Sequence, residues 1–107
     1  MLMITSGEGK YKVWLEKHEL DEGLVFILGG GERSHIGGIV LCEPGKNSEV
    51  IRLEGHYDDI VLKPIAEAAC KKYDIKIVAV GGVHVDDATQ DEIDLLVENC
   101  KKLIDDL

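Results

Sequence analysis

The sequence predicts one α+β (α/β) domain with the element order β-β-β-β-α-β-α, whose two helices pack on one face of a mixed, mostly antiparallel sheet. Three observations predict this class. The chain has 107 residues, 45% of them apolar, which suffices for one hydrophobic core but not for two. Its first half contains four short apolar or alternating segments, typical of strands. Its second half adopts the 3.6-residue period of helices. We therefore treat residues 1–107 as a single domain.

The four strand-like segments of the first half are bounded by turn residues. Residues 11–15 alternate in polarity, and residues 24–28 form a continuous apolar run behind the turn at residues 21–23. Residues 39–42 and 50–53 follow, separated by the turn-rich residues 43–48. The simplest arrangement of four such consecutive strands is an antiparallel meander.

The second half predicts two helices with a strand between them. Apolar residues follow a helical stripe over residues 59–73, in which Pro64 marks either a helix start or a kink. Residues 77–80 form a short apolar strand. Thr89 and Glu92 form a capping-box pattern ahead of a helical stripe that reaches residue 107.

Two predicted strands are apolar at every position, namely residues 24–28 and 77–80. Such strands are typical of sheets that are dry on both faces. Because two helices cover only one face, we expect a second copy of the chain, or curling of the sheet, to cover the other. The sequence thus predicts a homo-oligomer, a dimer or larger.

Composition and charge exclude several classes of partner. The 21 acidic and 12 basic side chains give a net charge of −9, and no run of Lys or Arg exceeds two residues. DNA, RNA and anionic membranes are therefore poor partners. No apolar run reaches the roughly 18 residues of a membrane span, and the N-terminus lacks a signal-peptide pattern. We expect a cytoplasmic protein.

The three cysteines are spaced about 30 residues apart and form no CxxC motif. Cys70 and Cys100 fall on the apolar stripes of the predicted helices, and Cys42 falls in a predicted strand. We expect buried, reduced, structural thiols rather than nucleophiles or zinc ligands.

Three of the four histidines lie in glycine-flanked turns at the ends of predicted elements. His35 lies in GGGERSHIGG (residues 29–38), His56 in EGHYDD (54–59) and His84 in GGVHVDD (81–87). Each turn alone is equally consistent with a structural role. Their repetition favours a binding site, because glycine permits close approach of the backbone to a ligand and turns carry binding groups.

Two chemistries fit these turns. Glycines 29–31 with Arg33 and His35 have the parts of an anion pocket, although no P-loop or GxGxxG motif is present. Carboxylates at residues 58, 59, 86 and 87 adjoin His56 and His84, which also suits a divalent metal. No serine lies in a nucleophile elbow and no cysteine adjoins a histidine, so covalent catalysis is not expected.

The segments GGGERSHIGG, GHYDDIVLKPIAEAACKKY (residues 55–73) and VGGVHVDDATQDEIDLLVENC (residues 80–100) resemble, in order and spacing, the small D-subunit of gallate-type hydroxyaromatic decarboxylases, a prenylated-flavin chaperone family. The resemblance covers most of the chain from residue 29 onward. It implies a non-catalytic accessory protein that binds prenylated FMN or its reduced precursor and supports a prenylated-flavin-dependent decarboxylase. It also implies a fold similar to proteasome-assembly chaperones.

The resemblance implies a set of cofactor-binding residues. These are Gly30, Gly31, Arg33, His35, Gly37, His56, His84 and Asp86, to which we add Tyr57 as a candidate cofactor contact of this chain. The chain departs from the family pattern at Ser34, in place of proline, and at Tyr57, in place of lysine. The second change removes a cation that could pair with phosphate, and provides an aromatic ring that could stack on a ring system.

Three hypotheses follow. In the first, a cofactor-binding accessory protein uses Arg33 and His35 to neutralise a phosphate, while His56 and His84 line the ring site. In the second, a small metal-dependent enzyme uses His35, His56, His84 and Asp86 as ligands. In the third, the glycine-rich turns form the docking surface of a purely structural assembly chaperone or subunit. All three share one fold, so fold alone does not separate them.

Overall fold

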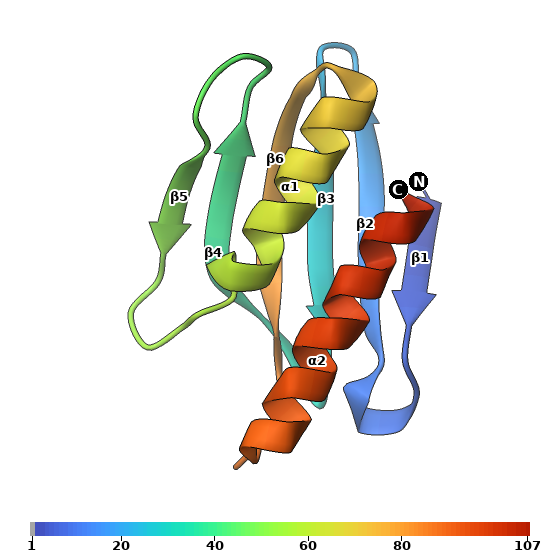
Figure 1. The fold of residues 1–107 in the computed structure, drawn as a ribbon, viewed down its shortest axis with the longest axis vertical. Coiled ribbons are helices and arrows are strands. Elements are labelled where there is room, and N and C mark those ends of the chain that lie inside the picture. The colour runs from blue at the N-terminus through green and yellow to red at the C-terminus, as the bar shows by residue number, and fades with distance from the viewer. Residues whose placement is uncertain (1) are drawn as a thin grey trace.

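Six strands form one mixed sheet in the order β1-β2-β3-β6-β4-β5 in the computed structural model, which describes residues 2–107. The strands are β1 (Leu2–Ser6), β2 (Val13–Leu20), β3 (Gly23–Gly30), β4 (Arg33–Cys42), β5 (Glu49–Arg52) and β6 (Lys76–His84). The helices are α1 (Asp59–Tyr73) and α2 (Gln90–Leu103), with short 3-10 helices η1 (Gly9–Tyr11) and η2 (Ile104–Asp106). Both long helices cover the same face of the sheet, α1 over β4 and β6 and α2 over β1 and β2 (Figure 1). The predicted α+β class is confirmed.

The sheet is mixed and mostly antiparallel, as predicted, but the meander is wrong. Strand β6 lies between β3 and β4, parallel to the first and antiparallel to the second. Strands β3 and β4, which a meander would pair with each other, are therefore separated by β6. The physical reason lies in β6 itself, because residues 77–80 of this strand are all apolar and are best accommodated in the middle of a sheet, away from water.

Strand β1 is absent from the predicted element order. Its five residues are mostly exposed, and Ile4 is the member that packs partly against the core. A short edge strand therefore carries little of the apolar signal that marks the other strands. It pairs antiparallel with β2 from Leu2 opposite Lys17 to Ser6 opposite Val13.

Helix α1 occupies the predicted residues. It begins at Asp59, before Pro64, so the alternative in which the helix starts at the proline is wrong. Asp74 follows the helix in the left-handed conformation, with φ of 52°, and its N–H donates to the Cys70 carbonyl. This C-terminal cap ends the helix and turns the chain into β6.

Helix α2 begins with the predicted capping box. The Thr89 hydroxyl accepts a hydrogen bond from the Glu92 N–H at 3.2 Å, and the Glu92 carboxylate accepts one from the Thr89 N–H at 3.1 Å. Glu92 also accepts a hydrogen bond from the Tyr11 hydroxyl at 2.5 Å. The start of α2 is thereby tied to η1 at the end of the sheet.

The core lies between the sheet and the two helices. Leu15, Phe26 and Leu28 from the sheet pack with Leu62 and Ile65 of α1, and all five are almost fully buried. The prediction of buried thiols is confirmed, because Cys42, Cys70 and Cys100 are free and buried. Burial raises the pKa of the Cys70 thiol to about 11 and, together with the nearby Asp58 carboxylate, that of Cys100 to about 12.

The opposite face of the sheet carries no helix. Cross-strand pairing aligns Ile27, Val80, Ile39 and Ile51 in one row on that face, and Val25, Val78 and Leu41 in the next. We refer to these seven residues as the open face. Most are half-buried by their neighbours in the sheet, and Ile51 is exposed. Within residues 2–107, no helix has the length and apolar character needed to cross a membrane.

Candidate functional site

A groove of about 740 Å³ lies on the helix-covered side, where the ends of β4 and β6 approach the loop before α1 and the first half of α2. Its volume falls in the range of small-molecule and cofactor sites, about 300 to 1,000 Å³. One wall is apolar and comes from the helices, with Ile60, Ile93, Leu96, Val97 and Cys100. The other wall is polar and comes from the glycine-rich turns, with Arg33, His35, His56 and His84.

The three glycine-flanked histidines meet in this groove. The ring centroids of His35 and His56 lie 4.6 Å apart in an edge-to-face arrangement, and those of His35 and His84 lie 5.7 Å apart. The pairing of β4 with β6, which sets Arg33 opposite His84, brings two of the turns together. The loop between β5 and α1 supplies His56. Turns that are distant in the sequence therefore build one cluster, which we call the histidine cluster.

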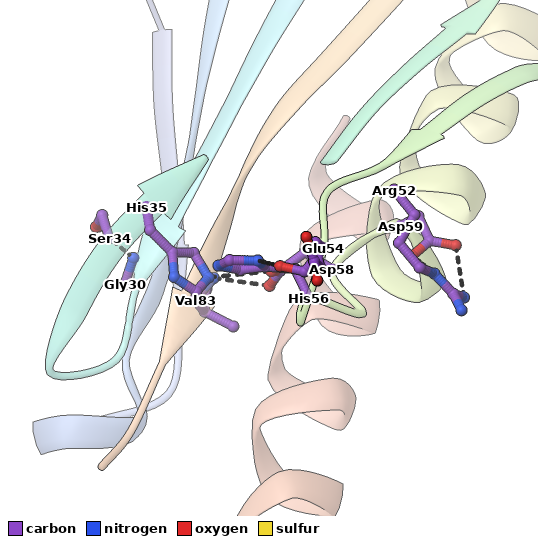
Figure 2. Close-up of polar contacts among 9 residues, drawn as sticks. All are labelled: Gly30, Ser34, His35, Arg52, Glu54, His56, Asp58, Asp59 and Val83. Atoms are coloured by element: carbon purple, nitrogen blue, oxygen red, sulfur yellow. Dashed lines mark hydrogen bonds and ion pairs between the residues drawn. The ribbon is translucent and has the colours of Figure 1, made fainter. Parts of the chain in front are cut away.

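Asp58 is the buried anchor of the histidine cluster. Its side chain is 9% exposed, and Oδ2 lies 3.0 Å from His35 Nε2. Its other oxygen, Oδ1, accepts a hydrogen bond from the Val83 N–H at 3.0 Å. Figure 2 shows His35, His56 and Asp58 gathered between the strands and the start of α1, with the Arg52–Asp59 pair apart from them. A single carboxylate thus joins β4, β6 and α1.

Two glycines make room for this arrangement. A Cβ at Gly82 would lie 2.5 Å from His35 Cδ2 and 2.6 Å from Asp58 Cγ. A Cβ at Gly37 would overlap Asp58 Oδ2. Such contacts are too close for any side chain, so both positions require glycine because His35 and Asp58 occupy the space.

Arg33, Asp86 and His84 form a second polar unit at the rim of the groove. Asp86 Oδ1 lies 2.5 Å from the Arg33 guanidinium and 2.9 Å from His84 Nε2. The Asp86 N–H donates to Glu32 at 2.8 Å, which fixes the turn. His84 first, and then the Arg33 charge, hold the pKa of the Asp86 carboxyl below its usual value. The ionised Asp86 carboxylate thus holds both Arg33 and His84 in place.

The glycine turn at Gly30 and Gly31 does not form the expected anion nest. The Gly30 N–H donates to Ser34 Oγ and the Gly31 N–H donates to the Lys12 carbonyl, both at 2.9 Å. Their φ angles of 129° and 74° turn the chain from β3 towards β4. An anion pocket built on glycines 29–31 would need free N–H groups, and at Gly30 and Gly31 the turn uses them itself. Within residues 2–107, the lining of the groove includes neither glycine.

Tyr57 lines the mouth of the groove and is 67% exposed. The Arg52 guanidinium lies over its ring, 4.8 Å from the centroid, and pairs with Asp59 through bonds of 2.7 and 3.0 Å. The arginine holds the pKa of the Asp59 carboxyl below its usual value. A cation therefore lies beside Tyr57, at the position where the resemblance implies a lysine, but it comes from strand β5.

The metal hypothesis finds no support in the geometry. No three His, Cys, Asp or Glu side chains of residues 2–107 are placed to hold a metal ion. The histidine cluster instead directs ring nitrogens to a carboxylate or a carbonyl. The rings lie close together, but the three ring nitrogens whose contacts are fixed face three different acceptors.

A family profile described as the prenylated flavin chaperone LpdD-like domain matches residues 7–107. The chain belongs to this family. The resemblance identified from the three glycine-rich segments is thus confirmed, and the match extends it over β2 and β3. The family description supports an accessory, chaperone role.

This LpdD-like domain also has a structural neighbour. A chain from a crystal structure of a chaperone complex for yeast 20S proteasome assembly aligns with a TM-score of 0.57 at 12% identity, covering 99% of this chain and 98% of that one. At that identity the likeness shows a shared fold, which confirms the expected similarity to proteasome-assembly chaperones. No curated protein matches the chain.

Sequence reasoning about this LpdD-like domain missed several site residues. Asp58 was grouped with the other carboxylates, although its burial at the centre of the histidine cluster makes it the most constrained of them. Gly82, Ile93 and Val97 were not singled out for the site at all. The adjacent glycines 81 and 82 were a usable signal for Gly82, whereas the apolar wall of α2 resembles any buried helix face.

Proposed function

We propose that the groove binds prenylated FMN or its reduced precursor, and that the chain supports a prenylated-flavin-dependent hydroxyaromatic decarboxylase as a non-catalytic accessory protein. The observation that carries the proposal is a groove of cofactor size with a histidine cluster facing an apolar wall. Family membership supports a prenylated flavin as the ligand class. We place the protein in the cytoplasm, where its three free thiols stay reduced.

The residues present fit such a cofactor. A flavin has a large ring with apolar faces and polar edges, and the groove offers aliphatic side chains opposite imidazoles. Tyr57, exposed at the mouth, would stack on the ring. Arg33, whose side chain is 66% exposed at the rim, would pair with the phosphate. His35 lies deeper and is held by Asp58, so in this proposal it contacts the ring rather than the phosphate.

An accessory protein that delivers a cofactor must also release it, and a groove with an exposed mouth allows the cofactor to leave. Its mouth is formed by exposed residues, Arg33, Tyr57 and Ile60. Its cysteine, Cys100, is buried and carries a raised pKa, so the thiol is not a ready nucleophile. When bound, the cofactor would bring its own redox and carbanion-stabilising chemistry. The chain's residues would hold it and shield one side of its ring.

We also propose that a second copy of the chain covers the open face. The face is aliphatic across four neighbouring strands and lies opposite the groove-bearing side. An aliphatic surface bordered by charged residues, here Glu16 and Glu49, is typical of an interface, and equivalent rows of two copies can face each other in a symmetric dimer. The groove would stay open on each copy.

The direct test is an anaerobic absorbance titration of the purified chain with reduced prenylated FMN, with oxidised prenylated FMN and unmodified FMN as comparators. We expect saturable binding by the wild type and a loss of at least about tenfold in the His56→Ala and Arg33→Ala variants. Lys46→Ala is the matched control, since Lys46 pairs with Glu43 on a distant turn. Saturable binding that none of the site variants weakens would contradict the assignment of the groove.

A second arm tests the accessory role. The loaded chain is mixed with an apo decarboxylase of the prenylated-flavin class, and turnover of a hydroxybenzoate is followed. We expect activity to appear faster than with free cofactor. Co-purification with the decarboxylase, without any flavin binding by the chain, would instead support the purely structural hypothesis.

A further inference from the structure

The contacts of Asp58 determine which nitrogen of His35 carries the proton. An ionised carboxylate only accepts hydrogen bonds, so the 3.0 Å contact with Asp58 Oδ2 requires a proton on His35 Nε2. Asp58 is held in this role because its other oxygen is already occupied by the Val83 N–H. A neutral His35 therefore has a bare Nδ1.

The bare nitrogen lies on the far edge of the ring from its anchor. The Cδ2 atom of His35 lies against Gly82, and Nε2 faces Asp58. The Nδ1 edge is opposite both, and His35 lines the groove. Within residues 2–107, Nδ1 has no hydrogen-bond partner.

The other two rings are fixed in the same way. His84 Nε2 faces Asp86 Oδ1 at 2.9 Å, and this also assigns the proton to Nε2. His56 Nδ1 lies 2.8 Å from the Glu54 carbonyl oxygen, which can only accept, so this ring has a bare Nε2. In its neutral form, each of the three neighbouring imidazoles thus donates from one ring nitrogen to a protein oxygen. Its other ring nitrogen is then unprotonated and can accept a hydrogen bond.

We infer that Asp58 is a positioning residue that makes His35 a hydrogen-bond acceptor, and that the histidine cluster selects ligands whose rings carry N–H donors. The inference rests on the proposed function for the identity of the ligand as a flavin. A flavin ring presents an imide N–H at position N3, between two carbonyl groups. A site of bare imidazole nitrogens favours that donor and disfavours a ring in which it is blocked.

The experiment uses nitrogen-15 NMR of the histidine side chains in the full chain, which reports the protonation of each ring nitrogen directly. We expect His35 to be protonated at Nε2 in the wild type and at Nδ1 in Asp58→Asn. The asparagine oxygen can still accept from the Val83 N–H, while its amide then faces His35 Nε2 as a donor. A wild-type His35 protonated only at Nδ1 would overturn the inference.

The same samples are titrated with FMN and with N3-methyl FMN, in which a methyl group replaces the donor hydrogen; the added bulk is common to the wild type and Asp58→Asn. In the wild type, we expect FMN to shift the His35 Nδ1 signal and to bind about tenfold more tightly than the methylated form. In Asp58→Asn we expect this preference to disappear. Equal binding of the two flavins by the wild type, or no response of His35 to either, would overturn the inference.

Two further variants keep the outcome interpretable. Asp86→Ala removes the oxygen that accepts from both His84 Nε2 and Arg33 on the exposed rim, where the fold does not depend on it, so it should release the His84 tautomer and reduce the preference. Asp21→Asn is the matched control, because Asp21 lies in the turn between β2 and β3 and does not line the groove. If the FMN preference holds while reduced prenylated FMN binds no more tightly than FMN, the proposed function fails and the inference stands.

Discussion

The hydroxyl of Tyr11 donates a 2.5 Å hydrogen bond to the carboxylate of Glu92, a residue 81 positions later in the chain. Glu92 also pairs with Lys10 at 3.2 Å and closes the capping box of α2. The Tyr11 carbonyl accepts a further hydrogen bond from the Asn99 amide at 2.9 Å. One end of the sheet thus holds the helix that forms the apolar wall of the groove.

Removal of the Tyr11 hydroxyl should loosen this connection. In Tyr11→Phe we expect the melting temperature to fall by a few degrees, because Glu92 loses its closest donor while the ring packing is kept. Thermal unfolding followed by circular dichroism measures the change. Tyr73→Phe is the control, since the Tyr73 hydroxyl accepts only a 3.3 Å bond from Lys17 at the other end of the sheet, and it should melt close to the wild type.

The same carboxylate predicts an acid-sensitive contribution to stability. The Tyr11 hydroxyl, the Thr89 N–H and Lys10 lower the pKa of Glu92 from 4.5 to about 2. A lowered folded-state pKa stabilises the fold above the unfolded value, and this stabilisation disappears as the pH falls from 4.5 towards 2. We expect Glu92→Gln to be less stable than the wild type at neutral pH. In urea unfolding at a series of pH values, the free energies of unfolding of the two proteins should become equal near pH 2. A difference that stays constant with pH would show that the Glu92 charge is not its cause.

Neighbouring positions on α1 should separate stability from binding. Leu62 is a fully buried residue of α1, and Leu62→Ala should lower the free energy of unfolding by about 2–5 kcal/mol. Ile60 is 55% exposed on the groove wall, so Ile60→Ala should change stability little and weaken flavin binding. Urea unfolding and flavin titration of both variants measure these effects. A large loss of stability in Ile60→Ala would contradict its placement.

Gly82→Ala should disrupt the histidine cluster. The added Cβ would lie 2.5 Å from His35, so the ring or the strand must shift. We expect altered His35 side-chain signals by NMR and loss of flavin binding. Gly45→Ala is the control: its Cβ meets no atom within 4 Å, and its φ of 76° costs about 1 kcal/mol of strain without touching the site. An unchanged histidine spectrum in Gly82→Ala would show that the close packing is not required.

A charge on the open face should prevent self-association. Ile39 pairs with Val80 on one side and Ile51 on the other, which places it within the aliphatic row. We expect Ile39→Glu to be monomeric by light scattering under conditions where the wild type is a dimer, since an interface cannot bury an unpaired carboxylate. A wild type that is monomeric at high concentration would refute the proposed interface.

Local signals predicted α2 and α1 well, because the Thr89–Glu92 box and the apolar stripe act within a few residues of one another. The position of β6 was not predictable in this way, since strand order depends on contacts between distant segments. The recurring histidines pointed to one site, yet their use as cofactor contacts stays a prediction. The role of Asp58 arises only after β6 brings the Val83 N–H beside the start of α1.

The central place of β6 also has a consequence for the order of folding. Strands β3 and β4 each need β6 as a neighbour, but β6 begins only at Lys76. During synthesis, the hairpins β2–β3 and β4–β5 therefore emerge with inner edges that have nothing to pair with. Sheet closure must wait for the last third of the chain, which favours slow folding and exposes the nascent chain to edge-to-edge aggregation.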